Sequence, residues 1–418
     1  RMVFRKYKPA SQWGKQDTRI FKAILNARNA RKMPVFRVPD AVKALGVKVH
    51  DPTTNTFYES EAVQEVQNDH QKIRAKANDI TSHPLYKNTP CRLFEGAEPM
   101  SDGVDQACVL SKAVLHTEFP QHVMQNALEE FDEDKIRDAI LHGERYDPTL
   151  EKLPRRFDPV LFWLKHHRVH GTPVIKRGNI ILDNLFRHII FAAIGKEKLT
   201  ANHIKIDRDE PFSATIRSGP YFNQSPLVIR GQPHITAINT NSSAQKVWAN
   251  EEEIKAASCS PLISISPLSP LIDLSSDHIY NDEPVVARPS EASNAALHTL
   301  AWTREQSQKY PWTSEQNAAN AVLYTFGAAV AEAQRRREKS LSSTPVMARG
   351  VQLVDGRLDL VAVQLNTLDL SHTEEKKNIV WLEKGVRLYK TKPFFEQLET
   401  VDELNMDAFR KLSALFLS

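Results

Sequence analysis

The segment 314–339 and the two apolar runs that follow it constrain the fold of this 418-residue chain most strongly. Ser314 stands where a helix N-cap would stand, although Asn317 leaves the capping box incomplete. The middle of the segment is built from Ala, Leu, Val and Phe, and three arginines close it at the negative end of the helix dipole. Asp355-Gly356 then separates the β-like runs 346–354 and 358–365, which is a strong hairpin signal. The sequence thus predicts a long helix followed by a hairpin.

The rest of the chain shows helical periodicity first and strand periodicity later. Helices are expected over residues 17–32, 58–80, 104–117, 120–141, 157–169, 175–194, 251–257 and 406–417. Strands are expected at 212–217, 227–230 and 234–239, as an antiparallel meander, and in a second hairpin, 379–382 with 386–389, around Lys384-Gly385. This order favours an α+β fold, with a mostly helical first half followed by antiparallel strands, a long helix and a C-terminal helix. We expect residues 1–80 to form a basic N-terminal extension with short helices, and 81–418 to form one large α+β body.

Charge is distributed unevenly along the chain. Residues 1–40 contain two acidic and eleven basic side chains, a net charge of +9, whereas the other 378 residues contain 44 basic and 49 acidic ones, a net charge of −5. The basic residues, interleaved with aromatic ones, are Arg1, Arg5, Lys6, Lys8, Lys15, Arg19, Lys22, Arg28, Arg31, Lys32 and Arg37. Such a segment can pair with phosphates and stack on unpaired bases, so these residues are the candidate RNA-binding set. A mitochondrial targeting remnant and a solvated tail are equally compatible with this composition.

Motifs for catalysis and for cofactor binding are missing from the sequence. There is no GxxxxGK[ST], no GxGxxG after a strand, no GxSxG and no HExxH, and 14 glycines are few for a chain built on glycine-rich ligand loops. The three cysteines form no CxxC pair, which argues against a zinc ribbon or a disulfide framework and fits a reducing compartment. We therefore predict no cofactor, no metal, no catalytic residues and no small-molecule substrate. The most apolar charge-free run, 316–331, is too short for membrane insertion.

A rival interpretation is a metal-dependent nuclease or hydrolase. His166 and His170 have the i,i+4 spacing of helical metal ligands, but Lys165 and Arg168 disfavour a cation there. Its acidic residues would be Asp207, Asp209 and Asp273. The predicted strand 360–367 offers amides, Gln364 and Asn366, where such an enzyme needs carboxylates for Mg²⁺. A polar loop at 207–210 is therefore the favoured interpretation.

Several stretches between His83 and the C-terminal helix, about four fifths of the chain, form an ordered series. They are HPLYKNTPCRLFEG (83–96), FSAT (212–215), VIRG (228–231), SPLSPLIDLSSDHIYND (266–282), HTLAW (298–302), LYTFGAAVAEAQ (323–334), VAVQLNTLDL (361–370), KNIVW (377–381) and AFRKLSALFL (408–417). The series resembles the mitochondrial large-subunit ribosomal protein thirty-seven family. That family has a paralogue in the same particle, once named programmed cell death protein nine. Residues 1–80, the loop 143–156 and the Pro/Ser stretch near Cys259 depart from the family pattern.

The resemblance implies a structural, non-catalytic protein of the mitochondrial ribosome that works in the matrix. It implies contacts with large-subunit rRNA and with other large-subunit proteins, including the paralogue. We hypothesise that the basic arm follows rRNA while the body packs on neighbouring proteins, because a net negative body suits protein contacts better than broad RNA coverage. The alternative is a free matrix protein that binds RNA or activates translation, since a basic arm alone fits that function too.

Overall fold

A computed structural model describes eleven stretches of the chain, residues 38–46, 92–129, 131–145, 151–195, 203–216, 227–240, 247–256, 295–338, 345–370, 376–396 and 398–418. Two compact units are distinguished, Arg1–Lys76 and Ala77–Ser418. In the first unit the described part contains the short helix α2 (Asp40–Ala44), in which Lys43 pairs with Asp40 at 3.4 Å. The helices expected over 17–32 and 58–80 lie outside the described residues.

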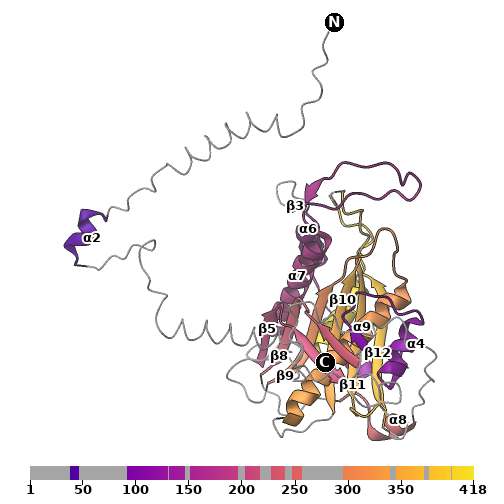
Figure 1. Ribbon diagram of the computed structural model, residues 1–418. Helices are drawn as coiled ribbons and strands as arrows, with labels where there is room; N and C mark the ends of the chain where they lie inside the picture. The colour runs from indigo at the N-terminus through magenta and orange to yellow at the C-terminus, as the bar shows by residue number, and fades with distance from the viewer. Residues whose placement is uncertain are drawn as a thin grey trace, which may run out of the picture. The chain divides into compact units, whose positions relative to one another are not determined.

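A seven-stranded mixed sheet organises the second unit (Figure 1). From one edge to the other its strands are β2 (Ala113–His116), β12 (Asn378–Arg387), β11 (Arg357–Leu365), β10 (Val346–Val354), β9 (Ala296–Thr303), β8 (Ile235–Asn239) and β5 (Ile204–Arg208). The pairs β2–β12 and β9–β10 are parallel, and the other neighbours are antiparallel. Helix α9 (Ser314–Glu338) connects β9 to β10, as a parallel pair requires.

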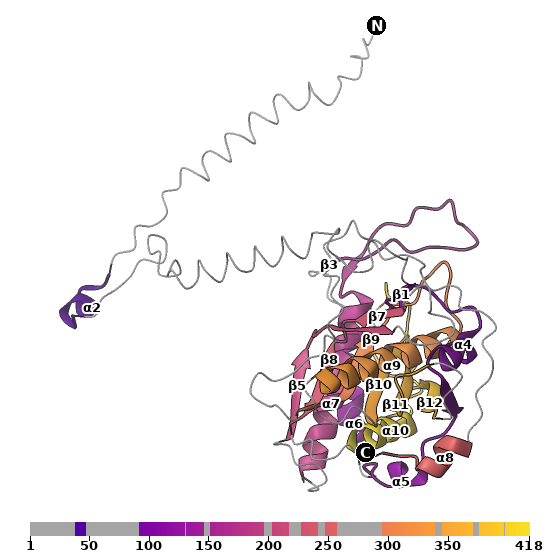
Figure 2. The same ribbon diagram turned by 60° about the horizontal axis from the view of Figure 1, so that its bottom comes forward.

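Two hydrophobic cores lie on opposite faces of this sheet. One core contains α9, α4 (Gly103–Leu110) and a small sheet of β1 (Arg92–Phe94), β7 (Leu227–Gly231) and β6 (Phe212–Ile216). The other contains α5 (Gln121–Met124), α6 (Glu133–Glu144), α7 (Val174–Gly195) and α10 (Met406–Leu417). Strand β10 supplies both cores, since Val346 and Ala348 face α9 whereas Met347 and Val351 face the other side. Figure 2 shows α9 lying across the strands. Both faces of the central strands are therefore covered.

Helix α9 is buried at every position from 317 to 333 because it packs between the large sheet and the strands β6 and β7. Its start differs from the expectation in detail. The capping box is formed one residue earlier, where the Thr313 hydroxyl accepts the Gln316 N–H at 3.2 Å and the Gln316 side chain accepts the Thr313 N–H at 2.9 Å.

Within the described ranges, no helix combines the length and the apolar character needed to cross a bilayer.

The close approach of α9 to the sheet depends on Gly350 in β10. A methyl group at this position would overlap the hydroxyl of Thr325, which donates a hydrogen bond to the Ala321 carbonyl at 2.8 Å. We expect Gly350→Ala to lower the free energy of unfolding by about 2 kcal/mol, the usual cost of overpacking a tight core. Thr325→Ala removes the obstacle, so the double variant should be more stable than Gly350→Ala alone. Urea denaturation of the three variants measures this, and a stability of Gly350→Ala equal to that of the unchanged chain contradicts it.

The α+β class is confirmed, as are several local elements. Helices α5, α6, α7, α8 (Glu251–Ala256) and α10 occur where helices were expected, and the β10–β11 hairpin turns at Asp355-Gly356, both with positive φ. The helix expected over 104–117 is correct only as far as Leu110. Lys112 adopts a φ of 48°, which ends the helical path, and the chain then enters β2 because those residues pair with β12.

The helix expected over 157–169 is wrong. These residues form the loop between the paired strands β3 (Glu151–Lys152) and β4 (His170–Gly171). Pro159 disfavours a helical conformation of Asp158, and the Asp158 carboxylate instead accepts the N–H groups of Val160 and Leu161 at 2.9 and 3.0 Å. The local turn therefore replaces the first turn of a helix.

Two strand expectations are also corrected. The hairpin expected around Lys384-Gly385 is one continuous strand, β12, in which Gly385 has a φ of 60° and the register with β11 shifts beside Asp359. The expected meander is divided, since β6 pairs with β7 in the small sheet whereas β8 joins the large one. In both cases the strand arrangement depends on pairing with strands that are distant in sequence, and the local periodicity of a segment does not predict such pairing.

Candidate functional site

The predicted RNA-binding residues of the arm, the eleven basic side chains from Arg1 to Arg37, all lie outside the described residues. The same holds for Asp273 of the rival hydrolase interpretation and for Cys91 and Cys259. Cys108 is buried on α4 in the core that contains α9. The structure therefore bears on the other candidate residues, which lie in the second unit.

The histidine pair does not form the expected helical chelate. His166 lies in the loop after β3 and His170 begins β4, so their spacing of four residues does not place them on one helix face. Among the described residues, no group of three His, Cys, Asp or Glu side chains lies close enough together to hold a metal ion. The i,i+4 argument fails because the segment 157–169 is not a helix.

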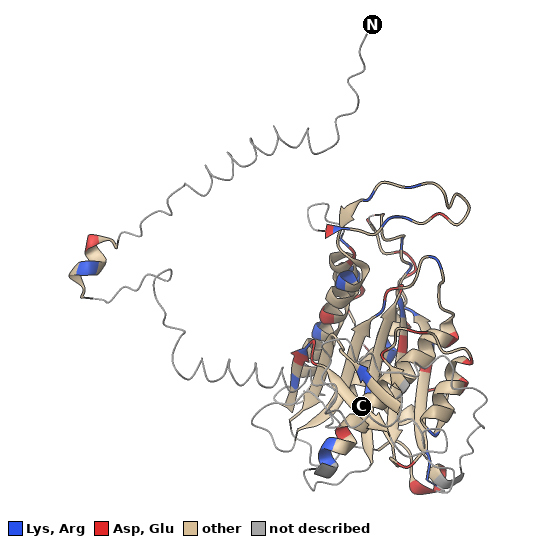
Figure 3. Cartoon of the chain, viewed as in Figure 1, with Lys and Arg blue, Asp and Glu red and all other residues tan. Residues whose placement is uncertain are grey.

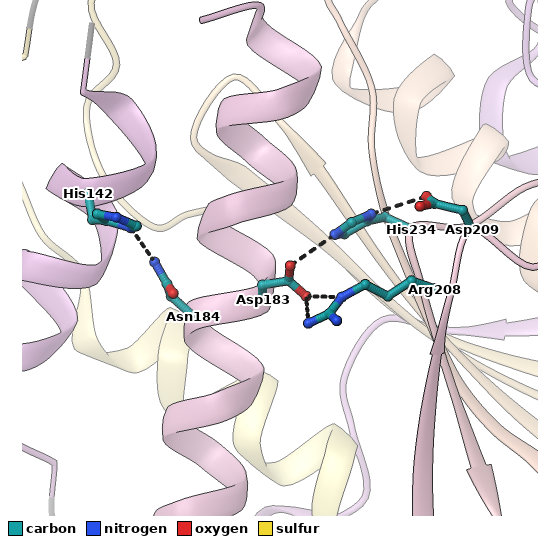
Figure 4. A network of polar contacts seen from close by, with 6 residues as sticks. All are labelled: His142, Asp183, Asn184, Arg208, Asp209 and His234. Atoms are coloured by element: carbon teal, nitrogen blue, oxygen red, sulfur yellow. Dashed lines mark hydrogen bonds and ion pairs between the residues drawn. The ribbon is translucent and has the colours of Figure 1, made fainter. Parts of the chain in front are cut away.

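The acidic cluster belongs to a network that joins α7 to the edge strand β5 (Figure 4). Asp183 on α7 accepts hydrogen bonds from Arg208 at 3.1 and 3.2 Å. His234 lies between two carboxylates, with Nε2 at 3.2 Å from Asp183 and Nδ1 at 3.2 Å from Asp209. Asp207 lies on β5 rather than in a loop and pairs with Lys205 at 3.0 Å.

Figure 4 also shows the neighbouring contact of Asn184 with His142, at 3.3 Å. None of the six residues drawn there carries a nucleophilic hydroxyl or thiol. A histidine held by carboxylates needs such a partner to work as a general base in covalent catalysis. The network therefore fastens α7 to the edge of the large sheet.

A cavity of about 490 Å³ lies between α7 and the loops that follow β9 and β12. Its main polar group is Glu144, which accepts hydrogen bonds from Arg177 at 3.0 Å and from the Tyr389 hydroxyl at 2.5 Å. Burial, together with the charge of Glu144, raises the pKa of Tyr389 well above its usual value, so this phenol stays protonated. Arg177 also donates to the Thr172 carbonyl at 2.9 Å and to the Phe394 carbonyl. Glu144, Arg177 and Tyr389 thus satisfy one another at the wall of the cavity.

A second buried polar network lies inside the core and centres on Gln352, whose exposed fraction is 0%. Its side-chain oxygen accepts the Trp302 indole N–H at 3.1 Å and the Asn320 amide at 2.7 Å. Its nitrogen donates to the Asn317 carbonyl at 2.9 Å and to the Asp359 carboxylate at 3.0 Å. Burial raises the pKa of Asp359 to about 6, although hydrogen bonds from Gly385 N–H and Gln352 oppose the shift. This network joins α9 to four strands, β9, β10, β11 and β12.

Gln364 near the end of β11 and Asn366 just after it, the amides that stand where a metal-dependent enzyme would need carboxylates, have a structural role. Gln364 accepts the N–H groups of Trp248 and Ala249 at 3.0 and 2.9 Å and donates to the Ala249 carbonyl at 3.1 Å. Asn366 donates to the Lys377 carbonyl at 2.8 Å and to no carboxylate among the described residues. These side chains hold the segment 247–250 and the start of β12 against the sheet.

Comparison with known proteins gives relatives that share one name. The chain is 26% identical to the large ribosomal subunit protein mL37 of Bos taurus, over 83% of this chain and 79% of the relative. It is 25% identical to the Mus musculus protein of that name, over 82% and 78%, and 26% identical to the one from Gallus gallus, over 80% and 75%. No family model matches. The named relatives align over most of both chains, and the ordered series of stretches resembles the same family, so the chain is similar over about four fifths of its length to the mL37 proteins of the large ribosomal subunit.

Proposed function

We propose that this protein is a structural component of the large subunit of the mitochondrial ribosome and supports translation in the matrix. The observation that carries the proposal is the shared name of the relatives, which align over about four fifths of the chain. In this role the protein performs no catalysis. The polar networks of the described body fit it, because their side chains are occupied in joining helices to sheets.

We assign the proposed partners from the uneven distribution of charge between the arm and the body. The arm, residues 1–40 with a net charge of +9, binds large-subunit rRNA through its eleven basic side chains. The body, beginning near residue 81, packs on other large-subunit proteins, the paralogue among them, and needs no membrane and no small-molecule substrate. A body built on one seven-stranded sheet with a core on each face offers rigid surfaces for such contacts.

Removing residues 1–40 tests the role of the arm. The truncated chain carries a separate matrix-targeting signal, so that import does not depend on the deleted residues. We expect its occupancy on large subunits at raised salt to fall about tenfold relative to the full chain, because phosphate contacts dominate salt-sensitive binding. The measurement is sedimentation of large subunits followed by quantification of the bound chain. A full-length control in which the eleven basic residues are glutamine keeps the length and the aromatic residues, and it should behave like the truncation.

The same gradient discriminates the alternative function. A free RNA-binding or translation-activating protein would sediment apart from large subunits at moderate salt, with or without the arm. Stable co-migration of the full chain supports the ribosomal role. Equal retention of the truncated and full chains at raised salt overturns the assignment of the RNA contact to the arm.

A further inference from the structure

The hairpin formed by residues 151–171 extends away from the rest of the body (Figures 1 and 2). Its base is fixed. Strands β3 and β4 pair through Glu151 with Gly171 and Lys152 with His170, and the Leu153 N–H donates to the Val169 carbonyl at 2.8 Å. Leu153 is buried, with an exposed fraction of 1%. The Phe157 N–H donates to Gln308 at 3.2 Å, which ties the loop to the segment after β9. The loop is therefore held at a defined place on the body.

The tip of the 151–171 hairpin exposes consecutive large apolar side chains. All five residues of 160–164 are exposed, and the exposed fractions of Phe162 and Trp163 are 70% and 65%. The two rings contact each other edge to face, with centroids 4.9 Å apart. The turn capped by Asp158 fixes the backbone that leads to them. Two aromatic rings are thus presented to solvent in a set arrangement.

Basic side chains flank the tip on both sides (Figure 3). The hairpin, residues 151–171, contains five Lys or Arg and two acidic residues, Glu151 and Asp158, so its net charge is +3 within a region, 41–418, whose net charge is −5. Arg156 lies over the Phe395 ring at 4.6 Å. The other four take part in no ion pair between described residues, and they are Lys152, Arg155, Lys165 and Arg168. The Asp158 carboxylate is already engaged by the N–H groups of the turn, and Glu151, at the base of the hairpin, pairs with Lys176.

We propose that the 151–171 hairpin binds a single-stranded segment of RNA, as a second RNA site separate from the arm. Bases stack on Phe162 and Trp163, and phosphates pair with Arg155, Lys165 and Arg168. Recognition of unpaired RNA combines these two elements, exposed aromatic faces and nearby cations that follow the backbone. This inference rests on the proposed function, since the ribosome would supply the RNA.

The charge distribution favours RNA over a protein partner. The buried centre of a protein–protein interface is depleted of charged residues, and lysine is depleted across such interfaces. Here Lys165 directly follows the apolar residues, and Arg155 and Arg156 precede them closely. A polyanion with stacking bases complements both the rings and the cations at once, which an apolar protein pocket does not.

The test uses large subunits assembled with the full chain and with rRNA that contains 4-thiouridine. Ultraviolet crosslinking followed by peptide mapping should give RNA adducts on peptides from 155–168. The variants Phe162→Ser/Trp163→Ser and Lys165→Glu/Arg168→Glu should each reduce these adducts about tenfold, since one stacked base contributes a factor of roughly 5 to 150. Phe191→Ser is the matched aromatic control, because Phe191 is 66% exposed on α7, and Lys376→Glu/Arg410→Glu is the matched charge control. Both controls should stay within about twofold of the unchanged chain, well below the stacking effect.

The outcomes separate this inference from the proposed function. Protein crosslinks through Lys165 to a neighbouring subunit, without RNA adducts on 155–168, overturn it in favour of a protein contact. If the hairpin gives neither RNA nor protein crosslinks, the proposed RNA site on the hairpin is overturned as well. RNA adducts on peptides from the arm test the RNA contact of the arm independently. If the chain does not sediment with large subunits, the proposed function fails. Binding of the full chain to a uridine dodecanucleotide, compared between the hairpin variants and their controls, then still decides whether the hairpin binds RNA.

Discussion

Replacing Gln352 by leucine should lower the free energy of unfolding by about 4 kcal/mol, because several buried polar groups lose their only good partner. The Trp302 indole and the Asn320 amide both donate to the Gln352 oxygen. Leucine has a similar size but offers no acceptor, so both donors are left buried and unpaired. The Asp359 carboxylate loses one of its two hydrogen bonds at the same time. Urea denaturation of the full chain gives the difference in stability.

Two further variants make this result specific. Gln121→Leu changes an exposed glutamine on α5 and should alter stability by no more than about 0.5 kcal/mol. Gln352→Glu keeps the acceptor for Trp302 and Asn320 but places a second carboxyl beside Asp359, so its stability should recover in acid. If Gln352→Leu lowers the free energy of unfolding by less than about 1 kcal/mol, the hydrogen bonds of Gln352 contribute little to the stability of the core.

Asp359 should make the stability of the protein depend on pH between about 4 and 6. Its pKa is about 6 in the folded chain, against 3.8 for the unperturbed carboxyl. Below pH 4 the carboxyl is protonated in both states and burial has no charge penalty. As the pH rises towards 6 the unfolded chain releases this proton first, so the free energy of unfolding falls. The total loss is about 3 kcal/mol and is complete above pH 6.

The difference between the unchanged chain and Asp359→Asn isolates this effect, because asparagine does not titrate. Other groups cancel in the difference, including His298, whose pKa is lowered by burial and by Arg349 and whose contribution has the opposite direction. We expect the stability of the unchanged chain, relative to the variant, to fall by about 3 kcal/mol from pH 4 to pH 7. Asp138→Asn, at an exposed position on α6, is the matched control variant. If the difference in stability between the unchanged chain and Asp359→Asn does not change with pH, burial does not raise the pKa of Asp359.

Local signals predicted the elements that local interactions determine. The long helix α9 and the Asp355-Gly356 hairpin follow from composition and from turn geometry, and both occur in the structure. Strand β9 was not predicted, because a strand covered on both faces shows no alternation of polar and apolar residues. The bulge at Gly385 was read as a turn for a related reason. A glycine with positive φ serves either structure, and the distant partner β11 decides between them.

For the candidate site, too, the sequence predicted some features and missed others. Charge counting identified the arm, and the assignment of its eleven basic residues to RNA stays a prediction. The 151–171 hairpin was missed because the apolar periodicity of 157–169 predicts an amphipathic helix, whereas the structure has a loop there and exposes residues 160–164. The signal that could have found it was present in the sequence. Asp158-Pro159 disfavours a helix at that point, and basic residues flank the apolar run on both sides.

The parallel pairing of β2 with β12 has a consequence for how the body is made. Asn378 at the start of β12 donates its side-chain amide to the Ser111 carbonyl beside β2, across 267 positions of sequence. A chain that emerges from a translocation pore amino end first exposes one half of this contact long before the other half arrives. Folding that depends on such distant contacts is slow, and its intermediates are prone to aggregate. We therefore expect the newly delivered chain to need a chaperone until β12 has entered the compartment.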